Sequence, residues 1–182
     1  MFWASSVIKV ADNTYWAYYQ AIDTQGGAHS GVLFITIQGT TITSLERYSG
    51  NPIVADTYEL VVARYDQNTW VGYNGYGHSN LLLSSDGLHW NYQQYNVLVP
   101  GGWSWDSSII YQQHAFIMGD TLYLIVVGNN QQLGLVYAKA GDWANLQYSP
   151  YNPIIPSGSG YTRLHKLRSG WTCTLQFCFG HS

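Results

Sequence analysis

Three unrelated sequence markers recur along this chain at one shared period of about 50 residues. They are a glycine that ends an apolar run, an aspartate turn before an aromatic strand, and an asparagine that opens a short apolar phrase. The markers stand at Gly39, Gly87 and Gly141, at Asp12, Asp66 and Asp120, and at Asn51, Asn96 and Asn152. Because independent markers keep one period, the chain is predicted to repeat one supersecondary unit.

The unit from Asn80 to Ile110 shows the order of events within a repeat. An apolar run ends in the turn Ser84-Ser85-Asp86-Gly87, and Trp90 closes that turn. Aspartate can accept hydrogen bonds from nearby backbone, and glycine can adopt a positive φ. We therefore interpret Asp86 and Gly87 as turn formers, with Trp90 packed beneath them.

Each repeat is expected to contain four strands, because β-branched and aromatic runs alternate with turn residues. The expected strands are 7–10, 15–19, 31–37 and 41–47, then 58–63, 70–73, 80–84 and 89–95, then 109–118, 121–127, 134–138 and 143–148. Apolar residues nowhere follow helical spacing for three turns. The sequence predicts an all-β fold, a β-propeller-type array of four-stranded antiparallel blades in one domain. About three and a half blades are present, as repeats of about 5–55, 56–105, 106–160 and a partial 161–182.

The partial fourth repeat raises the question of how the array closes. A hairpin from Leu164 to Phe179 begins a further blade, whereas the chain starts on an innermost strand. Three arrangements stay open: a piece of a longer propeller, closure by another copy in a homo-oligomer, or a partial propeller within a larger assembly. Cys173 and Cys178 would lie on opposite faces of an extended strand. Two buried thiols are favoured over a disulfide, which requires the strand to turn between them.

The composition indicates which classes of binding partner suit this chain. Only 9% of the residues are charged and 16% are aromatic, so the polar surface must come from Asn, Gln, Ser, Thr and Tyr. With seven Lys and Arg and a net charge of −3, the chain lacks the basic footprint that nucleic acids require. No apolar run is long enough to span a bilayer. We recognise no signal peptide, but this surface suits an extracellular or surface-associated, carbohydrate-facing protein.

Two stretches resemble a known superfamily. The phrase 84–90 with 96–100 and Trp105-Asp106 resembles the S-x-D-G-x-x-W, NPV(L/I) and WD pattern of five-bladed β-propeller glycoside hydrolases. That superfamily includes arabinanases, β-xylosidases and invertases. The segment 3–19 is similar to the inner-strand hairpin of the same enzymes. The resemblance spans nearly the whole chain but about three of five blades, and it is more specific for architecture than for activity.

The resemblance also implies where acids would stand. In those hydrolases an Asp base, an orienting Asp and a Glu acid project into the central funnel from the starts of inner strands, because glycoside hydrolysis needs paired carboxyl groups. The corresponding positions here hold Ala4, then Asp56 with Glu59 nearby, then Asp106. The first acid is therefore missing, and the third position has Asp in place of Glu. Asp56, Asp106 and Glu59 remain the candidate catalytic residues.

Other side chains are candidates for binding a sugar. Aromatic rings pack against the CH faces of sugars, and imidazoles can bond hydroxyls. These candidates are Trp103, Trp105, Tyr73, Tyr76, His78 and His114. Each also has a structural interpretation, as core between blades or as a hydrogen-bonded histidine, and Asp106 could cap a strand start. No metal site or cofactor is expected.

Three functions follow from these observations. The first is a glycoside hydrolase-like propeller that recognises, and can hydrolyse, a polysaccharide. The second is a non-catalytic, lectin-like propeller, which the missing acid and the repeated aromatics favour. The third is a structural or virion protein that presents loops. The preferred hypothesis is glycan recognition with residual glycosidase character.

Overall fold

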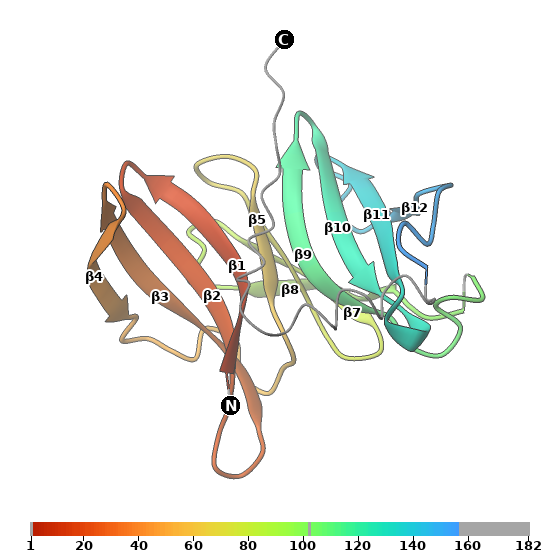
Figure 1. Cartoon of the computed structure of the whole chain (residues 1–182), viewed down its shortest axis with the longest axis horizontal. Helices are drawn as coiled ribbons and strands as arrows, with labels where there is room; N and C mark the ends of the chain where they lie inside the picture. Colours follow the sequence, from red (N-terminus) through yellow and green to blue (C-terminus); the bar gives the residue numbers. More distant parts are fainter. Residues whose placement is uncertain (1, 102, 157–182) are drawn as a thin grey trace.

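The computed structural model describes residues 2–101 and 103–156, which form three four-stranded antiparallel sheets (Figure 1). Each sheet is a meander, and we call the sheets blades 1, 2 and 3. Blade 1 comprises β1 (Phe2–Ala11), β2 (Thr14–Ile22), β3 (Ala28–Gln38) and β4 (Thr41–Arg47). Blade 2 comprises β5 (Val61–Arg64), β6 (Trp70–Asn74), β7 (Ser79–Ser84) and β8 (Asn91–Leu98). Blade 3 comprises β9 (Tyr111–Met118), β10 (Thr121–Val127), β11 (Leu133–Lys139) and β12 (Gln147–Tyr148), with a short 3-10 turn η1 (Asn129–Gln131).

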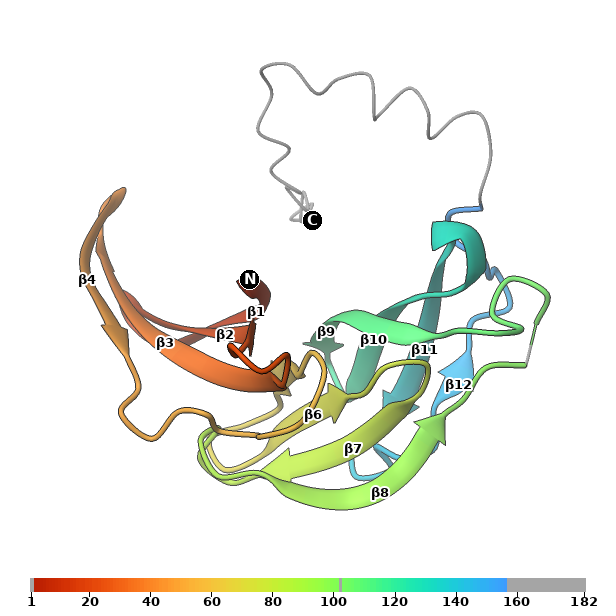
Figure 2. The same ribbon diagram turned by 90° about the horizontal axis from the view of Figure 1, so that it is seen from below.

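The three blades stand side by side in an arc, as the view from below shows (Figure 2). Strands β1, β5 and β9 are the first strand of each blade, and β5 contacts both β1 and β9. These inner strands line the centre of the arc, and each later strand lies further out. The fold is therefore the all-β, propeller-type array that the repeats predict. The hairpin 164–179 and both cysteines lie outside the described residues.

Two hydrophobic cores hold the blades together. The first core lies between blades 1 and 2, where Tyr18 and Val32 pack against Leu60, Val62 and Trp70. The second core lies between blades 2 and 3 and includes the buried side chains of Val61, Tyr73, Leu122 and Leu124. Neighbouring β5 residues point to opposite faces of the sheet, so Val61 and Val62 enter different cores. Blade 2 is thus apolar on both faces.

The edge of β5 and the residue before it are hydrogen-bonded to side chains of blade 1. Ser5 Oγ donates to the Leu60 carbonyl oxygen at 2.6 Å, and the Val62 amide donates to Ser6 Oγ at 2.8 Å. Both serines come from β1 and are buried. An inner strand has an edge whose backbone groups lack a strand partner, and buried groups of this kind need one. The serines supply that partner and attach blade 1 to blade 2.

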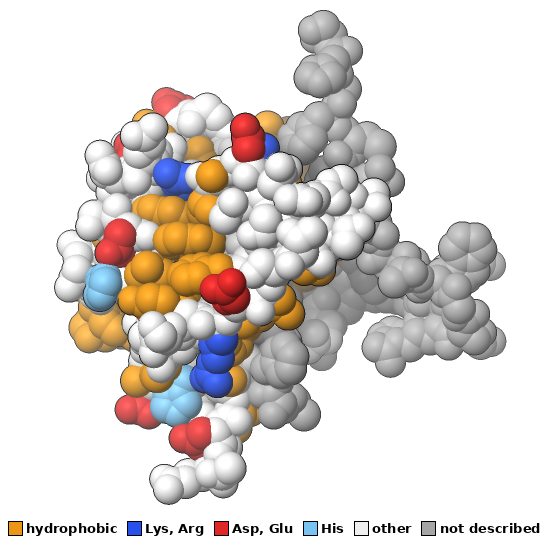
Figure 3. Space-filling model, turned by 90° about the vertical axis from the view of Figure 1, so that its left-hand side faces the viewer, with side chains coloured by type: hydrophobic (Ala, Val, Ile, Leu, Met, Phe, Trp, Pro, Cys, Tyr) orange, Lys and Arg blue, Asp and Glu red, His pale blue; other side chains and the backbone are white. Residues whose placement is uncertain are grey.

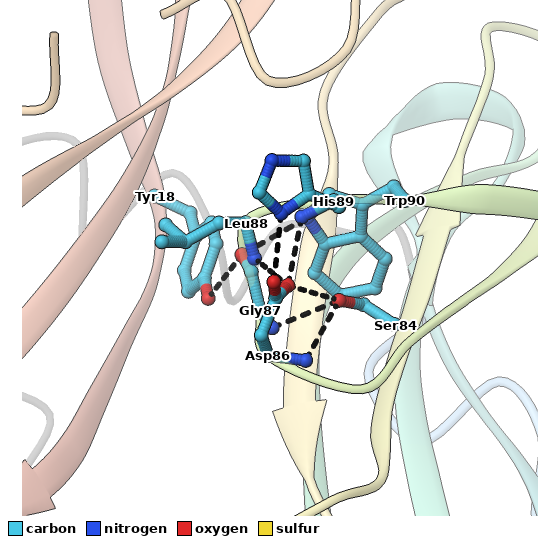
Figure 4. A network of polar contacts seen from close by, with 7 residues as sticks. All are labelled: Tyr18, Ser84, Asp86, Gly87, Leu88, His89 and Trp90. Carbon is cyan, nitrogen blue, oxygen red and sulfur yellow. Dashed lines mark hydrogen bonds and ion pairs between the residues drawn. The ribbon is translucent and has the colours of Figure 1, made fainter. Parts of the chain in front are cut away.

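The turn 84–90 is organised by Asp86, as the sequence predicts (Figure 4). Asp86 Oδ1 accepts from the amides of Leu88 and His89, both at 2.8 Å, and its Oδ2 lies 2.7 Å from His89 Nδ1. Gly87 has a φ of +78°, and Trp90 Nε1 donates to its carbonyl oxygen. The Tyr18 hydroxyl of blade 1 donates to that same oxygen at 3.1 Å. The turn therefore also joins two blades.

Blade 3 differs from the expected pattern at its outer strand. The expected strand 143–148 is reduced to β12, two residues long. Residues 139–145 instead form consecutive turns, in which Asp142 N bonds Lys139 O and Asn145 N bonds Asp142 O. These turns allow Trp143 to enter the second core, where its carbonyl oxygen accepts a 2.7 Å bond from the Tyr73 hydroxyl. Burial of the indole thus takes precedence over strand pairing.

The surface retains apolar side chains on blade 1. Hydrophobic side chains gather in one patch with charged side chains around it on the side where blade 1 lies (Figure 3). On β4, Ile42 and Leu45 are 58% and 60% exposed. In the described part of the chain, no helix is long and apolar enough to span a membrane.

The serine contacts predict a stability effect. Ser6→Ala should lower the free energy of unfolding by about 1 to 3 kcal/mol, because it leaves the buried Val62 amide without a partner. Urea unfolding monitored by circular dichroism measures this change. Ser44→Ala, on exposed β4, is the matched control and should change stability by less than about 0.5 kcal/mol. Equal effects of the two substitutions would refute the role given to Ser6.

The hydrogen bonds of Asp86 predict that the stability of the protein depends on pH in the acid range. Partial burial alone would raise the pKa of Asp86, but hydrogen bonds from His89, Leu88 and Ser84 outweigh it and hold this pKa below its ordinary value. A lowered pKa adds stability above the ordinary value near 4, and that stability is lost as the pH falls further. Asp86→Asn should therefore destabilise the protein at neutral pH and flatten the loss of stability below about pH 4. Urea unfolding at a series of pH values measures both effects, and an unchanged acid slope in the variant would contradict the role given to Asp86.

Candidate functional site

A pocket of about 310 Å³ lies where the inner strands begin. Its walls come from all three blades: the end of β2, the segment before β5, the β6–β7 turn and the start of β9. The lining residues are Gln20, Tyr58, Glu59, Gly75, Tyr76, Tyr111 and Gln113. We call this the axial pocket. Of the predicted site residues, Glu59 and Tyr76 line it.

Glu59 is held through its peptide groups by two glutamines. Gln20 Oε1, from β2 of blade 1, accepts from the Glu59 amide at 2.8 Å. Gln112 Nε2, from β9 of blade 3, donates to the Glu59 carbonyl oxygen at 2.8 Å. Both glutamine side chains are buried. Glu59 is therefore positioned by both neighbouring blades, and none of these bonds uses its carboxyl group.

Gln112 is itself fixed by further contacts. Its Nε2 also donates to the Gly75 carbonyl oxygen at 3.1 Å, and its Oε1 accepts from Ser79 Oγ at 2.7 Å. Gly75 has a φ of +132°, a conformation that other residues rarely adopt. The β6–β7 turn and the Glu59 segment are thus bonded to the same amide group, which fixes two walls of the pocket relative to each other.

The Glu59 carboxyl group is partly buried, and burial raises its pKa to about 7. Desolvation disfavours the charged form of a carboxyl group. At neutral pH the group therefore populates both protonation states, so it can donate or accept a proton or a hydrogen bond. A carboxyl group with such a pKa is suited to general acid chemistry.

Three tyrosines form an aromatic wall beside Glu59. The rings of Tyr58 and Tyr76 are 5.2 Å apart, and those of Tyr76 and Tyr111 are 6.3 Å apart and stacked. Tyr58 and Tyr76 are 49% and 60% exposed, so part of each side chain is accessible to a ligand. They come from the segment before β5 and from the β6–β7 turn.

Gln20 has a donor without a partner. Its Oε1 is bonded to the Glu59 amide, which fixes the orientation of the amide group. Its Nε2 is buried and has no hydrogen-bond partner among the described residues. Buried polar groups normally have partners, so this donor is an exception within the pocket wall.

Asp56 lies on the same segment as Glu59 but outside the pocket lining. It is exposed, with a φ of +50°, and its amide donates to His29 Nδ1 at 3.3 Å. His29 Nε2 lies 3.0 Å from Asp23 Oδ2. The hydrogen bond from His29, with those from the Gly27 and Gln25 amides, lowers the pKa of Asp23. The histidine thereby connects the β2–β3 loop to the Asp56 backbone.

Asp106, Trp103 and Trp105 form a separate turn before β9. Asp106 is fully buried, and its carboxyl group accepts from the Trp103 amide at 2.6 Å and from the Tyr148 hydroxyl at 2.8 Å. Trp105 is 3% exposed and belongs to the second core, whereas Trp103 is 45% exposed. The structure does not bring these residues to the axial pocket.

The remaining candidates are dispersed. Tyr73 is buried in the second core, and His78 lies beside Gly75 in the β6–β7 turn. His114 lines a different pocket of about 290 Å³, formed by later parts of the three inner strands. Among the described residues, no group of three His, Cys, Asp or Glu side chains could hold a metal ion.

Sequence reasoning missed the residues that position Glu59. Gln20 and Gln112 lie within strands and look like ordinary polar positions. Tyr58 and Tyr111 were included in expected strands but not in the site. The one available signal was a polar side chain at a strand position otherwise expected to be buried.

Comparisons with known proteins show the fold. No protein-family model matches the chain, and neither does any curated protein. Similar structures include a candidate glycosidase from Bacteroides thetaiotaomicron, with a TM-score of 0.61 and 16% identity over 84% of this chain and 54% of that one. A family 117 glycoside hydrolase from the marine bacterium Zobellia galactanivorans has a TM-score of 0.55 and 16% identity, over 86% and 57% of the two chains.

A third structure comes from work on the GH130 family of mannoside phosphorylases, which contains glycoside hydrolases that target β-1,2 mannosidic linkages in Candida mannan. It has a TM-score of 0.59 and 11% identity, over 78% of this chain and 48% of that one. The chain therefore spans about half the length of these structures. It has the fold of the five-bladed glycoside hydrolase propellers, as far as its three blades extend.

Proposed function

We propose that this chain recognises a carbohydrate in the axial pocket. The observation that supports the proposal best is the combination of Glu59, at a pKa of about 7, with the aromatic wall of three tyrosines. The pocket lies where inner strands begin, the position that the glycoside hydrolase resemblance implies for the functional site.

The chemistry of the walls fits a sugar. The exposed faces of Tyr58 and Tyr76 can pack against the CH face of a pyranose ring. The Glu59 carboxyl group can accept a hydrogen bond from a sugar hydroxyl or donate one to it. A neutral or partly protonated acid suits an uncharged ligand, because no buried anion has to be neutralised.

Hydrolysis is a second candidate function, and the raised pKa of Glu59 favours it. A glycosidase needs a second carboxyl group to activate water or to attack the sugar. Among the described residues, Glu59 is the one carboxyl group that lines the axial pocket. Asp56, exposed on the same segment, is the candidate for the second role. Asp106 is engaged with Trp103 and Tyr148 and would have to exchange those bonds first.

Sugar binding can be tested with a glycan panel. The panel should include β-1,2-linked mannosides, since the GH130 family of one structural neighbour contains hydrolases that target that linkage. Tyr76→Ala should weaken binding by about tenfold, because it removes one aromatic contact. Tyr95→Ala is the matched control, since Tyr95 is 64% exposed on β8 and does not line the pocket. Isothermal titration measures both affinities, and equal loss in the two variants would contradict the site.

Glu59 predicts a pH dependence of stability. Its pKa is raised in the folded protein, so the folded state binds the proton more tightly and stability falls as the pH rises from about 4.5 to about 7. Glu59→Gln should remove this decline, a difference on the order of 2 kcal/mol in the free energy of unfolding at neutral pH. Urea unfolding across this pH range measures the effect. A variant that keeps the full decline would show that another group causes it.

Turnover of aryl glycosides tests hydrolysis separately from binding. If the second candidate holds, Glu59→Gln should abolish turnover while retaining affinity within about tenfold, since the amide keeps the shape of the acid. Asp56→Asn should also reduce turnover. Binding without turnover in the unsubstituted protein would support recognition alone, and absence of binding to every glycan would overturn the proposal.

A further inference from the structure

An aromatic row crosses the outer face of blade 3. Phe116 pairs with Tyr123, and Tyr123 pairs with Tyr137, in direct cross-strand register on β9, β10 and β11. Their ring centroids are 5.3 and 6.3 Å apart. These three side chains belong to neither of the two cores, because they point away from blade 2. We call them the blade 3 row.

Blade 1 has an equivalent row that blade 2 covers. Ile8 pairs with Trp16, and Trp16 pairs with Phe34, on the first three strands of that blade. Trp70 of blade 2 stacks on Trp16, with centroids 5.3 Å apart and planes 16° apart. The Phe116, Tyr123 and Tyr137 positions are thus those that a following blade would cover.

The chain leaves blade 3 as it leaves blade 1. The Asn51 side chain accepts from the Val32 amide and donates to the Val32 carbonyl oxygen, both at 2.9 Å. Asn152 makes the same pair of bonds to Leu135, at 2.8 and 2.9 Å. Three residues after each asparagine the chain bridges back to the same blade, at Val54 with Ser30 and at Ile155 with Leu133.

After blade 1, this path leads directly to blade 2 and to Trp70. Asn51 and Asn152 are 101 residues apart, and Trp70 and Trp171 are separated by the same number of residues. Apolar residues then alternate with polar ones at Trp171, Cys173, Leu175 and Phe177. Alternation of this kind is typical of a strand with one buried face.

We propose that the segment 161–179 docks on the blade 3 row, with the Trp171 indole stacked on Tyr123 as Trp70 stacks on Trp16. The segment would begin a further blade and bury the outer face of blade 3. This inference does not depend on the proposed ligand, since the blade 3 row does not line the axial pocket.

Cysteine cross-linking in the full chain tests the proposal. The two native cysteines are first replaced, as Cys173→Ala and Cys178→Ser. Tyr123→Cys is then combined with Trp171→Cys, and a short thiol-reactive cross-linker is added at low protein concentration. The control pair is Leu45→Cys with Trp171→Cys, because Leu45 is exposed on blade 1. Peptide mapping identifies the linked pair, and near-UV circular dichroism verifies folding.

We expect the 123–171 link to form within one chain and at least about tenfold faster than the 45–171 link, because docked groups have a high effective concentration. A faster 45–171 link would show that the segment covers blade 1 instead. Links between chains alone would show that a second copy covers the row.

A double-mutant cycle provides an independent readout. Tyr123→Ala and Trp171→Ala should each lower the urea midpoint, and the double variant should lose less than the sum of the two, since the residues share one contact. Tyr151→Ala, at an exposed position, should be additive with Trp171→Ala. Additivity in both pairs would exclude contact between Tyr123 and Trp171.

Discussion

The hydrogen-bonding needs of one strand edge govern much of this structure. Strand β5 lies at the centre of the arc, and on that edge its backbone lacks a strand partner. Side chains of the two neighbouring blades supply partners for the peptide groups of residues 59, 60 and 62. These side chains are Gln20, Gln112, Ser5 and Ser6. All four partners are uncharged and buried, so the strand is satisfied without the cost of burying ions.

The same constraint determines where chemistry can occur. Glu59 is the residue at which bonds from blades 1 and 3 converge, so its carboxyl group lies where three blades meet. Convergence partly buries the carboxyl group, and burial raises its pKa. The tyrosines complete the pocket because the Tyr58 segment and the β6–β7 turn are drawn to the same amide group. Fold and candidate site therefore share one network of hydrogen bonds.

The sequence predicts local features of this protein well because they depend on near neighbours. The Asp86-Gly87 turn follows from backbone bonds within a few residues, and the strands follow from alternation and turn chemistry. Contacts between blades are harder to predict from the sequence. Gln112 resembles any polar strand residue until blade 2 is in place, and Trp105 looks like a binding platform until the second core surrounds it. Likewise, β12 is short because Trp143 is buried in that core, and no local sequence pattern predicts this burial.

The way in which Glu59 is held has a consequence for how such a protein can change. Its amide and carbonyl groups make the bonds to blades 1 and 3, and neither of these bonds uses its side chain. A substitution at this position would replace the chemistry of the pocket and leave both of these bonds in place. Evolution, or a protein engineer, could therefore exchange an acid for an amide or a hydroxyl group here and obtain a different ligand preference on an unchanged scaffold.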